Sequence, residues 1–232
     1  MPRNQNQILQ DRIDQLLPQD RGLRILEAGC GSVSHISFGT VEHLVGIDIS
    51  EKQLGRNEQL NEKILGDLQT YELGKETFDV IVSWDVLEHI EHPEKALMNF
   101  FQATRPGGLI ILAAPNFWSL KGMVTWILPH RMHVWFYRYV IGDKRAGTQD
   151  FGPFKTYLKS SMWPENICKS AEGQGFSVEM FDEYEGPVPR HLRTKSKVFD
   201  LAFSLLGGVS RVLTAGKIDL NNSDYMLILK KK

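Results

Sequence analysis

Three carboxylates follow short apolar runs in the first third of the chain: Glu27, Asp48 and Asp67. Gly29 and Gly31 come directly after the first of them, and glycine permits positive φ angles and the close approach of a ligand to the backbone. A carboxylate at this point attracts an ammonium or sulfonium group at short range. The other two acids are able to accept hydrogen bonds from ribose hydroxyls and from an adenine amino group. This spacing predicts a site for a positively charged nucleoside.

A dinucleotide site is the competing interpretation, because it also has glycines after a strand and an acid about 20 residues further on. Such a site uses the pattern Gly-x-Gly-x-x-Gly and a helix N-terminus that faces the pyrophosphate. Here the sixth position is Ser34, and the charge of Glu27 would repel a pyrophosphate. We therefore favour S-adenosylmethionine (SAM), which carries an ammonium, a sulfonium, a ribose and an adenine, over a nicotinamide dinucleotide.

The apolar pattern around these residues predicts strands that alternate with helices. Predicted strands cover residues 24–28, 44–49, 63–66, 78–83, 109–114, 176–182 and 224–229. Predicted helices cover residues 5–17, 50–60, 71–76, 93–104, 162–172 and 198–213, and another is expected after the Gly31 turn. This alternation is typical of β-α-β units around a parallel sheet, and strands that are apolar on both faces indicate helices on both sides of it.

Five segments occur in an order that matches a known family: ILEAGCGS, VGIDIS, ILGDLQTY, FDVIVSWDVLEHIEHPEKAL and RPGGLIILAAPN. In these segments the chain resembles the class I (Rossmann-like) SAM-dependent methyltransferases, which include the ubiquinone-type O-methyltransferases. The resemblance implies an α/β fold with a mostly parallel, doubly wound sheet of seven strands, the last antiparallel, and with helical cap insertions. It also implies that SAM binds across the carboxyl ends of the first strands and leaves as S-adenosylhomocysteine.

The resemblance assigns cofactor contacts to a small set of residues. They are Glu27, Gly29, Cys30, Gly31, Asp48, Ile49, Asp67, Leu68 and Trp84. Glu27 and the glycines belong to the methionine and sugar region, and Asp48 takes the ribose hydroxyls. Ile49 packs on the adenine, Asp67 and Leu68 take the adenine edge, and Trp84 lies beside the cofactor. The sequence departs from the family at Val33, where a third glycine is usual.

Simpler interpretations of the same residues stay open. The two glycines also suit an ordinary strand-to-helix turn. Asp48 also suits a solvated strand end or a helix N-cap, although Ser50 is itself a good cap. Asp67 also suits a plain turn. Cys30 is expected to be a small packing residue and not a nucleophile, because no motif supplies it with a base.

Asp85, Glu88 and His89 stand at positions i, i+3 and i+4, a spacing that puts three side chains on one face of a helix. Carboxylates and imidazole bind divalent metals, and the resemblance extends to O-methyltransferases in which such an arrangement holds one. With three candidate ligands in view, we expect no metal cofactor and favour a general-base role for His89. His130 and His133 are further candidate bases.

The rest of the chain predicts where an acceptor binds. We expect one methyltransferase domain over residues 1–232, with a SAM-binding half at 20–115 and cap insertions at 116–161 and 184–222. The first insertion is rich in aromatic residues, which favours a small hydrophobic or aromatic acceptor. The second joins a basic run to the apolar stripe at 198–213. Residues 190–213 suit peripheral contact with a membrane or lipid, but we favour a packed cap helix.

Composition excludes several classes of protein. The chain has 232 residues, 27 Lys and Arg against 28 Asp and Glu, and a formal net charge of −1, which argues against nucleic-acid binding. Two cysteines and no signal-like N-terminus favour the cytoplasm, and no apolar run reaches the ~18 residues of a spanning helix.

The sequence therefore predicts a methyltransferase that acts on a small molecule, with O-methylation favoured. A protein or nucleic-acid acceptor is less expected, because no Asn-Pro-Pro-Tyr-type amine motif follows the fourth strand. The alternatives are an N- or C-methyltransferase, and a SAM-binding protein without transferase activity.

Overall fold

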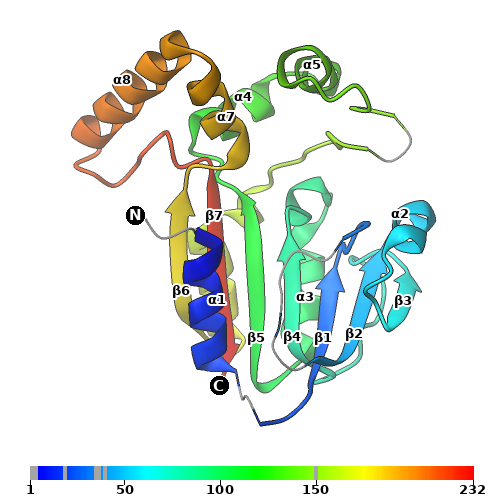
Figure 1. Cartoon of the computed structure of the whole chain (residues 1–232). Coiled ribbons are helices and arrows are strands. Elements are labelled where there is room, and N and C mark those ends of the chain that lie inside the picture. Colours follow the sequence, from blue (N-terminus) through cyan, green and yellow to red (C-terminus); the bar gives the residue numbers. More distant parts are fainter. Residues whose placement is uncertain (1–4, 18–19, 34–37, 39–40, 149–150) are drawn as a thin grey trace. The chain divides into compact units, whose positions relative to one another are not determined.

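A seven-stranded β-sheet organises the chain, in the order β3-β2-β1-β4-β5-β7-β6 (Figure 1). The computed structural model describes residues 5–17, 20–33, 38, 41–148 and 151–232. The strands are β1 (Leu23–Ala28), β2 (Val41–Asp48), β3 (Glu62–Leu65), β4 (Phe78–Trp84), β5 (Thr104–Pro115), β6 (Phe176–Tyr184) and β7 (Asp224–Lys231). The sheet is mostly parallel and β7 runs antiparallel to its neighbours, so the predicted fold class is confirmed.

Parallel pairing brings the ends of the first strands to one edge of the sheet. β1 pairs in parallel with β2 and with β4, and Glu27 lies opposite Gly46 of β2 and Val82 of β4. β3 pairs in parallel with β2, with Asp48 opposite Leu65. Because the carboxyl ends of parallel strands share an edge, the segments that follow these four strands lie close together there.

The chain divides into two compact units. The first comprises residues 1–112, 159–181 and 227–232, and the second comprises residues 113–158 and 182–226. The second unit holds nearly all of the two ranges that the sequence analysis treats as cap insertions. Their action as caps over an acceptor stays a prediction.

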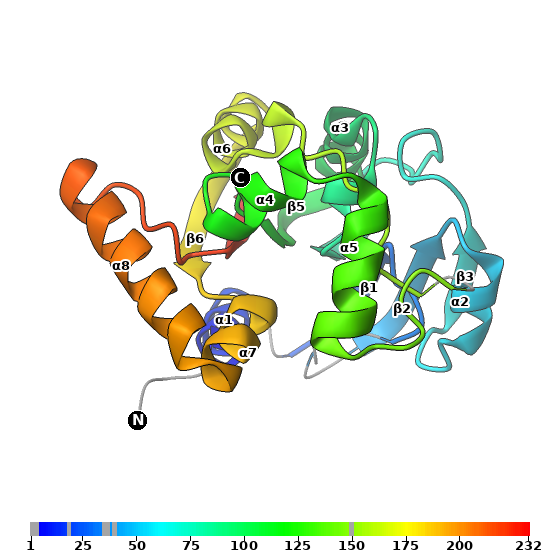
Figure 2. The ribbon, with the colours of Figure 1, turned by 90° about the horizontal axis from the view of Figure 1, so that it is seen from above.

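Helices of the first unit cover both faces of its part of the sheet. They are α1 (Gln5–Leu16), α2 (Glu51–Arg56), α3 (Pro93–Ala103) and α6 (Pro164–Gly173). Figures 1 and 2 show α1 on one face and α3 and α6 on the other, as predicted. The sequence of α3 explains its placement, because Pro93 occupies the first turn while Ala96, Leu97, Phe100 and Phe101 are buried at helical spacing.

Helices of the second unit occupy the aromatic-rich segment and the late apolar stripe. They are α4 (Leu120–Ile127), α5 (His130–Phe136), α7 (Pro187–Lys195) and α8 (Lys197–Leu213). A π-helical turn, Tyr137–Ile141, continues α5 and ends at Gly142, where φ is +94°. Among the described residues, no helix is long and apolar enough to cross a membrane.

The structure overturns the expectation that α8 is a packed cap helix. The helix forms where its periodicity predicts it, but most of its large apolar side chains are exposed. They are Val198, Phe199, Leu201, Leu205, Leu206, Val209, Val212 and Leu213. The residues that α8 buries are Phe203, Gly207 and Ser210, so a narrow face with two small residues makes its contacts.

Residues 71–76, predicted to be a short helix, contain none. Gly74 has φ +81° and Glu76 has φ +50°, and left-handed residues do not continue a right-handed helix. The side chain of Asn99 on α3 donates hydrogen bonds to the carbonyls of Leu68 and Tyr71, which satisfies this irregular backbone. The second predicted helix, at 50–60, is also shorter than expected and ends at Arg56.

Two expectations concern residues that the structure does not describe. The helix predicted after Gly31 falls on residues 34–37 and 39–40, and Ser34, which argued against a dinucleotide site, is among them.

Candidate functional site

The loop after β1 directs its backbone amides into the protein. The amides of Gly29 and Cys30 donate to the carbonyl of Ile47 at 2.8 and 3.2 Å, and the amide of Gly31 donates to Oδ2 of Asp48 at 2.9 Å. A pyrophosphate site at a glycine loop needs such amides to point at the ligand. These three consecutive amides already have partners in β2, which is a second argument against a dinucleotide.

Asp48 joins two segments at the edge of the sheet. Its Oδ2 accepts from the Gly31 amide, and its Oδ1 accepts from the Ser50 amide at 2.8 Å. Ser50 is the N-cap of α2 and accepts from the amide of Gln53, so Asp48 is not the cap. Each carboxylate oxygen has two lone pairs and keeps the capacity for a further hydrogen bond, such as one from a ribose hydroxyl. The next residue, Ile49, leaves 75% of its surface exposed.

The loop carries a negative potential. Glu27 is 4% exposed within β1. Burial raises the pKa of the neighbouring Cys30 thiol to about 12, and the charges of Asp48 and Glu27 add to this effect. Cys30 therefore stays a neutral thiol, as the sequence analysis expects. The same two carboxylates favour a ligand that brings an ammonium or sulfonium group.

The two glycines of the loop differ in what surrounds them. Gly29 has φ +74°, and a Cβ placed on it would lie 2.5 Å from both γ-carbons of Val86, in the segment after β4. Gly31 has φ +52°, and among the described residues a Cβ there would meet Oε1 of Gln53 alone, at 3.1 Å. Gly29 is needed for packing between two loops of the sheet edge, whereas Gly31 is less crowded by the described residues. The contact with Val86 was not foreseen from the sequence, because it joins positions far apart in the chain.

Asp67 forms a turn with its own neighbours. Its Oδ1 accepts from the amide of Gln69 at 2.9 Å, and both of its oxygens accept from the Gln69 side chain at 3.0 Å. Leu68 is buried. Asp67 thus lies in a turn, as the simpler interpretation of this residue predicts. The contact of Asp67 with adenine stays a prediction.

The segment after β4 does not have the helical geometry on which the sequence argument for a metal site at Asp85, Glu88 and His89 depends. Only Leu87–His89 form a helix, a single 3-10 turn, and Asp85 precedes it with φ +53°. Asp85 is exposed whereas Glu88 is buried, and Nε2 of His89 lies 3.8 Å from Oε1 of Glu88. Among the described residues, no group of three or more His, Cys, Asp and Glu side chains is arranged to hold a metal ion.

His130 and His133 lie together on α5, in the second unit, with ring centroids 6.4 Å apart. His130 is exposed, whereas Nε2 of His133 is buried and has no hydrogen-bond partner among the described residues. Burial lowers the pKa of His133, and the charge of the nearby His130 lowers it further. A hydrogen bond with the backbone of Leu128 raises this pKa but does not offset the other two effects. His133 is therefore neutral at pH 7, the state in which an imidazole is able to accept a proton.

Every residue predicted to bind the cofactor lies in the first unit, on or just after β1 to β4. The sheet brings the β1 loop, Asp48 and the segment after Trp84 to one edge. A residue that the sequence analysis missed is Asn57, whose buried side chain donates to the carbonyl of Cys30 at 3.4 Å and braces the same loop. No sequence signal distinguishes this Asn from a surface residue.

The fold and the loop geometry are compatible with one class of protein, the SAM-dependent methyltransferases with a Rossmann-like sheet. Residues 1–140 match a family model described as a methyltransferase domain. The chain therefore belongs to the class I SAM-dependent methyltransferase family.

Curated relatives share parts of the chain. A phosphoethanolamine N-methyltransferase 1 of Triticum aestivum is 32% identical over 104 residues, which are 40% of this chain and 20% of the relative. A mitochondrial ubiquinone biosynthesis O-methyltransferase of Candida albicans is 29% identical over 130 residues, which are 50% of this chain and 38% of the relative. The matched regions thus span well under two thirds of these two relatives. The ubiquinone biosynthesis O-methyltransferase of Aeromonas salmonicida is 26% identical and matches 83% of this chain and 81% of its own.

Solved structures share the fold. A SAM-dependent methyltransferase from Mesorhizobium loti matches 95% of this chain and 96% of its own, with a TM-score of 0.54 and 17% identity. A structure described as a [4+2]-cyclase, SpnF, matches 97% of this chain and 80% of its own, with a TM-score of 0.56 and 14% identity. Because a cyclase shares this fold, the fold alone does not assign methyl transfer.

We expect Gly29→Ala to destabilise the protein more than Gly31→Ala. Both substitutions place a Cβ at positive φ, which costs about 1–2 kcal/mol. Gly29→Ala also drives its Cβ into Val86, and such overpacking costs roughly 1–3 kcal/mol more. Denaturant unfolding measures both costs. The double variant Gly29→Ala/Val86→Ala should unfold close to Gly31→Ala, and equal losses in the two single variants would contradict the packing role of Gly29.

We expect His133 to make stability depend on pH. The unfolded chain binds a proton on this imidazole near pH 6.5, whereas the folded protein, with its lowered pKa, binds it only at lower pH. The folded state therefore loses stability as pH falls below about 6.5. Unfolding at about pH 7.5 and about pH 5.5 should show a smaller loss for His133→Gln than for the original chain. The control is His191→Gln, at an exposed histidine. Identical losses in all three proteins would refute the effect.

Proposed function

We propose that this chain transfers the methyl group of SAM to a hydroxyl of a small, hydrophobic or aromatic acceptor. The geometry of the β1 loop is the observation that supports SAM as the methyl donor. The amides of this loop are held by Ile47 and Asp48 and are not free, and the carboxylates of Glu27 in β1 and Asp48 in β2 lie at the two strand ends beside it. Such a loop suits a cationic nucleoside and does not suit a pyrophosphate.

When bound, SAM supplies a methyl group that is activated by its sulfonium. In the proposed site, Glu27 attracts the ammonium, Asp48 accepts from the ribose hydroxyls and the exposed Ile49 packs on adenine. Gly29, Cys30, Gly31, Asp67, Leu68 and Trp84 complete the cofactor contacts. The remaining task of the protein is to align the acceptor oxygen with the methyl group and to exclude water.

A hydroxyl acceptor must lose a proton, so a base is needed on the acceptor side. His89, His130 and His133 are the candidates, and the neutral state of His133 suits this role. No divalent metal is required, because displacement at an activated methyl carbon needs no Lewis acid at the acceptor when a base is at hand.

The choice of acceptor rests on two kinds of support. The first is the length of the sequence matches to two relatives. A ubiquinone biosynthesis O-methyltransferase matches 83% of this chain, whereas the phosphoethanolamine N-methyltransferase matches 40% of it. In addition, α4, α5 and the turn after them expose Trp126, Trp135 and Tyr139, which suit an aromatic or apolar acceptor. The alternatives are transfer to nitrogen or carbon, and cofactor binding without transfer.

We expect the chain to bind S-adenosylhomocysteine and not NAD. Because this product retains the ammonium and the ribose, Glu27→Gln and Asp48→Asn should each weaken its binding roughly 10- to 100-fold through loss of a charged hydrogen-bond partner. Isothermal titration calorimetry measures the affinities. Glu172→Gln, at an exposed position on α6, is the matched control and should bind as the original chain does. Binding of NAD, or unchanged affinity in both site variants, would refute the cofactor assignment.

We expect labelled methyl from SAM to appear on the hydroxyl of a phenolic acceptor and not on phosphoethanolamine, because the side chains proposed to receive the acceptor are aromatic. Turnover should persist in excess chelator. If a histidine is the base, one of His89→Gln, His130→Gln and His133→Gln should lower kcat by roughly 100-fold or more with little change in KM. Transfer only to an amine would refute O-methylation. Product binding without transfer to any acceptor in a metabolite extract would favour the non-transferase alternative.

A further inference from the structure

Helix α8 presents two different faces. Its exposed apolar residues share one broad side of the helix, at the spacing of Leu201, Leu205, Val209 and Val212. On the other side, Phe203, Gly207 and Ser210 are buried. An ordinary amphipathic helix of a globular protein buries its apolar stripe and exposes its polar residues. In α8 the apolar stripe is the face that is left uncovered.

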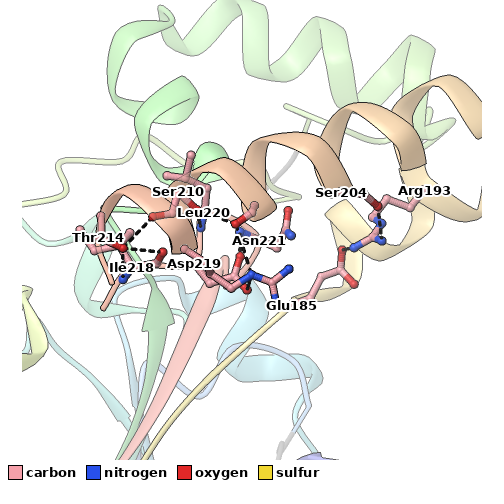
Figure 3. Close-up of polar contacts among 11 residues, drawn as sticks. Glu185, Arg193, Ser204, Ser210, Thr214, Ile218, Asp219, Leu220 and Asn221 are labelled. Carbon is pink, nitrogen blue, oxygen red and sulfur yellow. Dashed lines mark hydrogen bonds and ion pairs between the residues drawn. The ribbon is translucent and has the colours of Figure 1, made fainter. Parts of the chain in front are cut away.

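Polar contacts fix this orientation of α8 within the second unit. The hydroxyl of Ser210 donates to the carbonyl of Gly207 and accepts from the amide of Leu220 at 3.2 Å. A Cβ at Gly207 would collide with Asn221, so the loop after α8 packs closely against this point. Figure 3 shows Ser210, Leu220 and Asn221 on the side of α8 that faces residues 218–221.

Arg193 of α7 fixes the other end of α8. Its guanidinium contacts Asp200 of α8 at 2.8 Å. It also contacts Ser204 of α8 at 3.3 Å and Glu185, before α7, at 3.0 Å (Figure 3). Three hydrogen-bond partners hold the guanidinium of Arg193 in one orientation. Because both ends are held by polar bonds, α8 is unable to turn its apolar stripe inward without breaking them.

Exposed positive charge lies at the N-terminal end of the apolar stripe. The second unit contains twelve Lys and Arg and eight Asp and Glu, a formal charge of +4, although the whole chain carries −1. Exposed basic side chains lie directly before and at the start of α8, at Arg190, Lys195 and Lys197. Apolar side chains on one face with Lys and Arg beside them are typical of helices that lie in the interface of an anionic membrane.

We propose that α8 docks the protein on an anionic lipid surface, with its apolar stripe in the interface and the basic residues of α7 and its own first turn on the headgroups. A second copy of the chain is the less suitable occupant, because pairing two α8 faces would bring two basic units together. The inference is independent of methyl transfer, since it concerns a surface that contains no residue of the proposed cofactor site.

The test is co-sedimentation of the full chain with vesicles of phosphatidylcholine that contain phosphatidylglycerol, compared with pure phosphatidylcholine. We expect binding to the anionic vesicles that weakens as salt is raised. Leu205→Gln/Val209→Gln, at positions 60% and 55% exposed, should reduce binding roughly tenfold or more. Lys195→Gln/Lys197→Gln should reduce it by about 25-fold on anionic vesicles.

The matched control is Val178→Gln/Phe181→Gln, which removes two exposed apolar side chains from β6 in the first unit. It should bind vesicles as the original chain does, and thermal melts should show that all variants are folded. The proposal is refuted if the chain does not bind anionic vesicles, or if the control and the α8 variant bind equally. It is also refuted if light scattering shows a dimer that the α8 variant abolishes while vesicle binding persists. Each readout is made without SAM, so failure here leaves the proposed function untouched.

Discussion

The carboxylate of Asp48 is the constraint on which the candidate site depends. One of its oxygens holds the glycine loop after β1 and the other holds the amide of Ser50, which begins α2. The end of β2 thereby sets the shape of its neighbour's loop. This arrangement works only because β1 and β2 run in parallel and end at the same edge of the sheet. The chemistry of the loop therefore depends directly on the parallel topology of the sheet.

Most of the fold was predictable from periodicity. The seven strands and the helices α1, α3, α6 and α8 formed where short apolar runs or helical stripes predict them, because burial of these patterns is the main driving force. The predictions of secondary structure failed where the local backbone conformation outweighs the pattern of apolar residues. The segment before β4 has no helix because Gly74 and Glu76 adopt left-handed conformations, and α4 and α5 lie in an aromatic segment without a clear period.

The sequence predicted that the residues of the candidate site lie near one edge of the sheet, but it did not predict their contacts. Motif order identified Glu27, the glycines and Asp48. It did not show that the loop amides face inward, that Asn57 braces Cys30, or that Val86 requires a glycine at position 29. Such contacts depend on the distance between segments that are remote in sequence. For the same reason, the i, i+3, i+4 spacing after Trp84 was misleading, because it presupposes a helix that is a single 3-10 turn.

The inward amides of the β1 loop also bear on how this site changes in evolution. A phosphate-binding loop recognises its ligand with backbone atoms, which no point mutation is able to exchange. Here the backbone is already committed to Ile47 and Asp48, so discrimination between ligands is left to side chains. A lineage that carries this loop is able to alter its ligand preference by single codon changes while the scaffold stays intact.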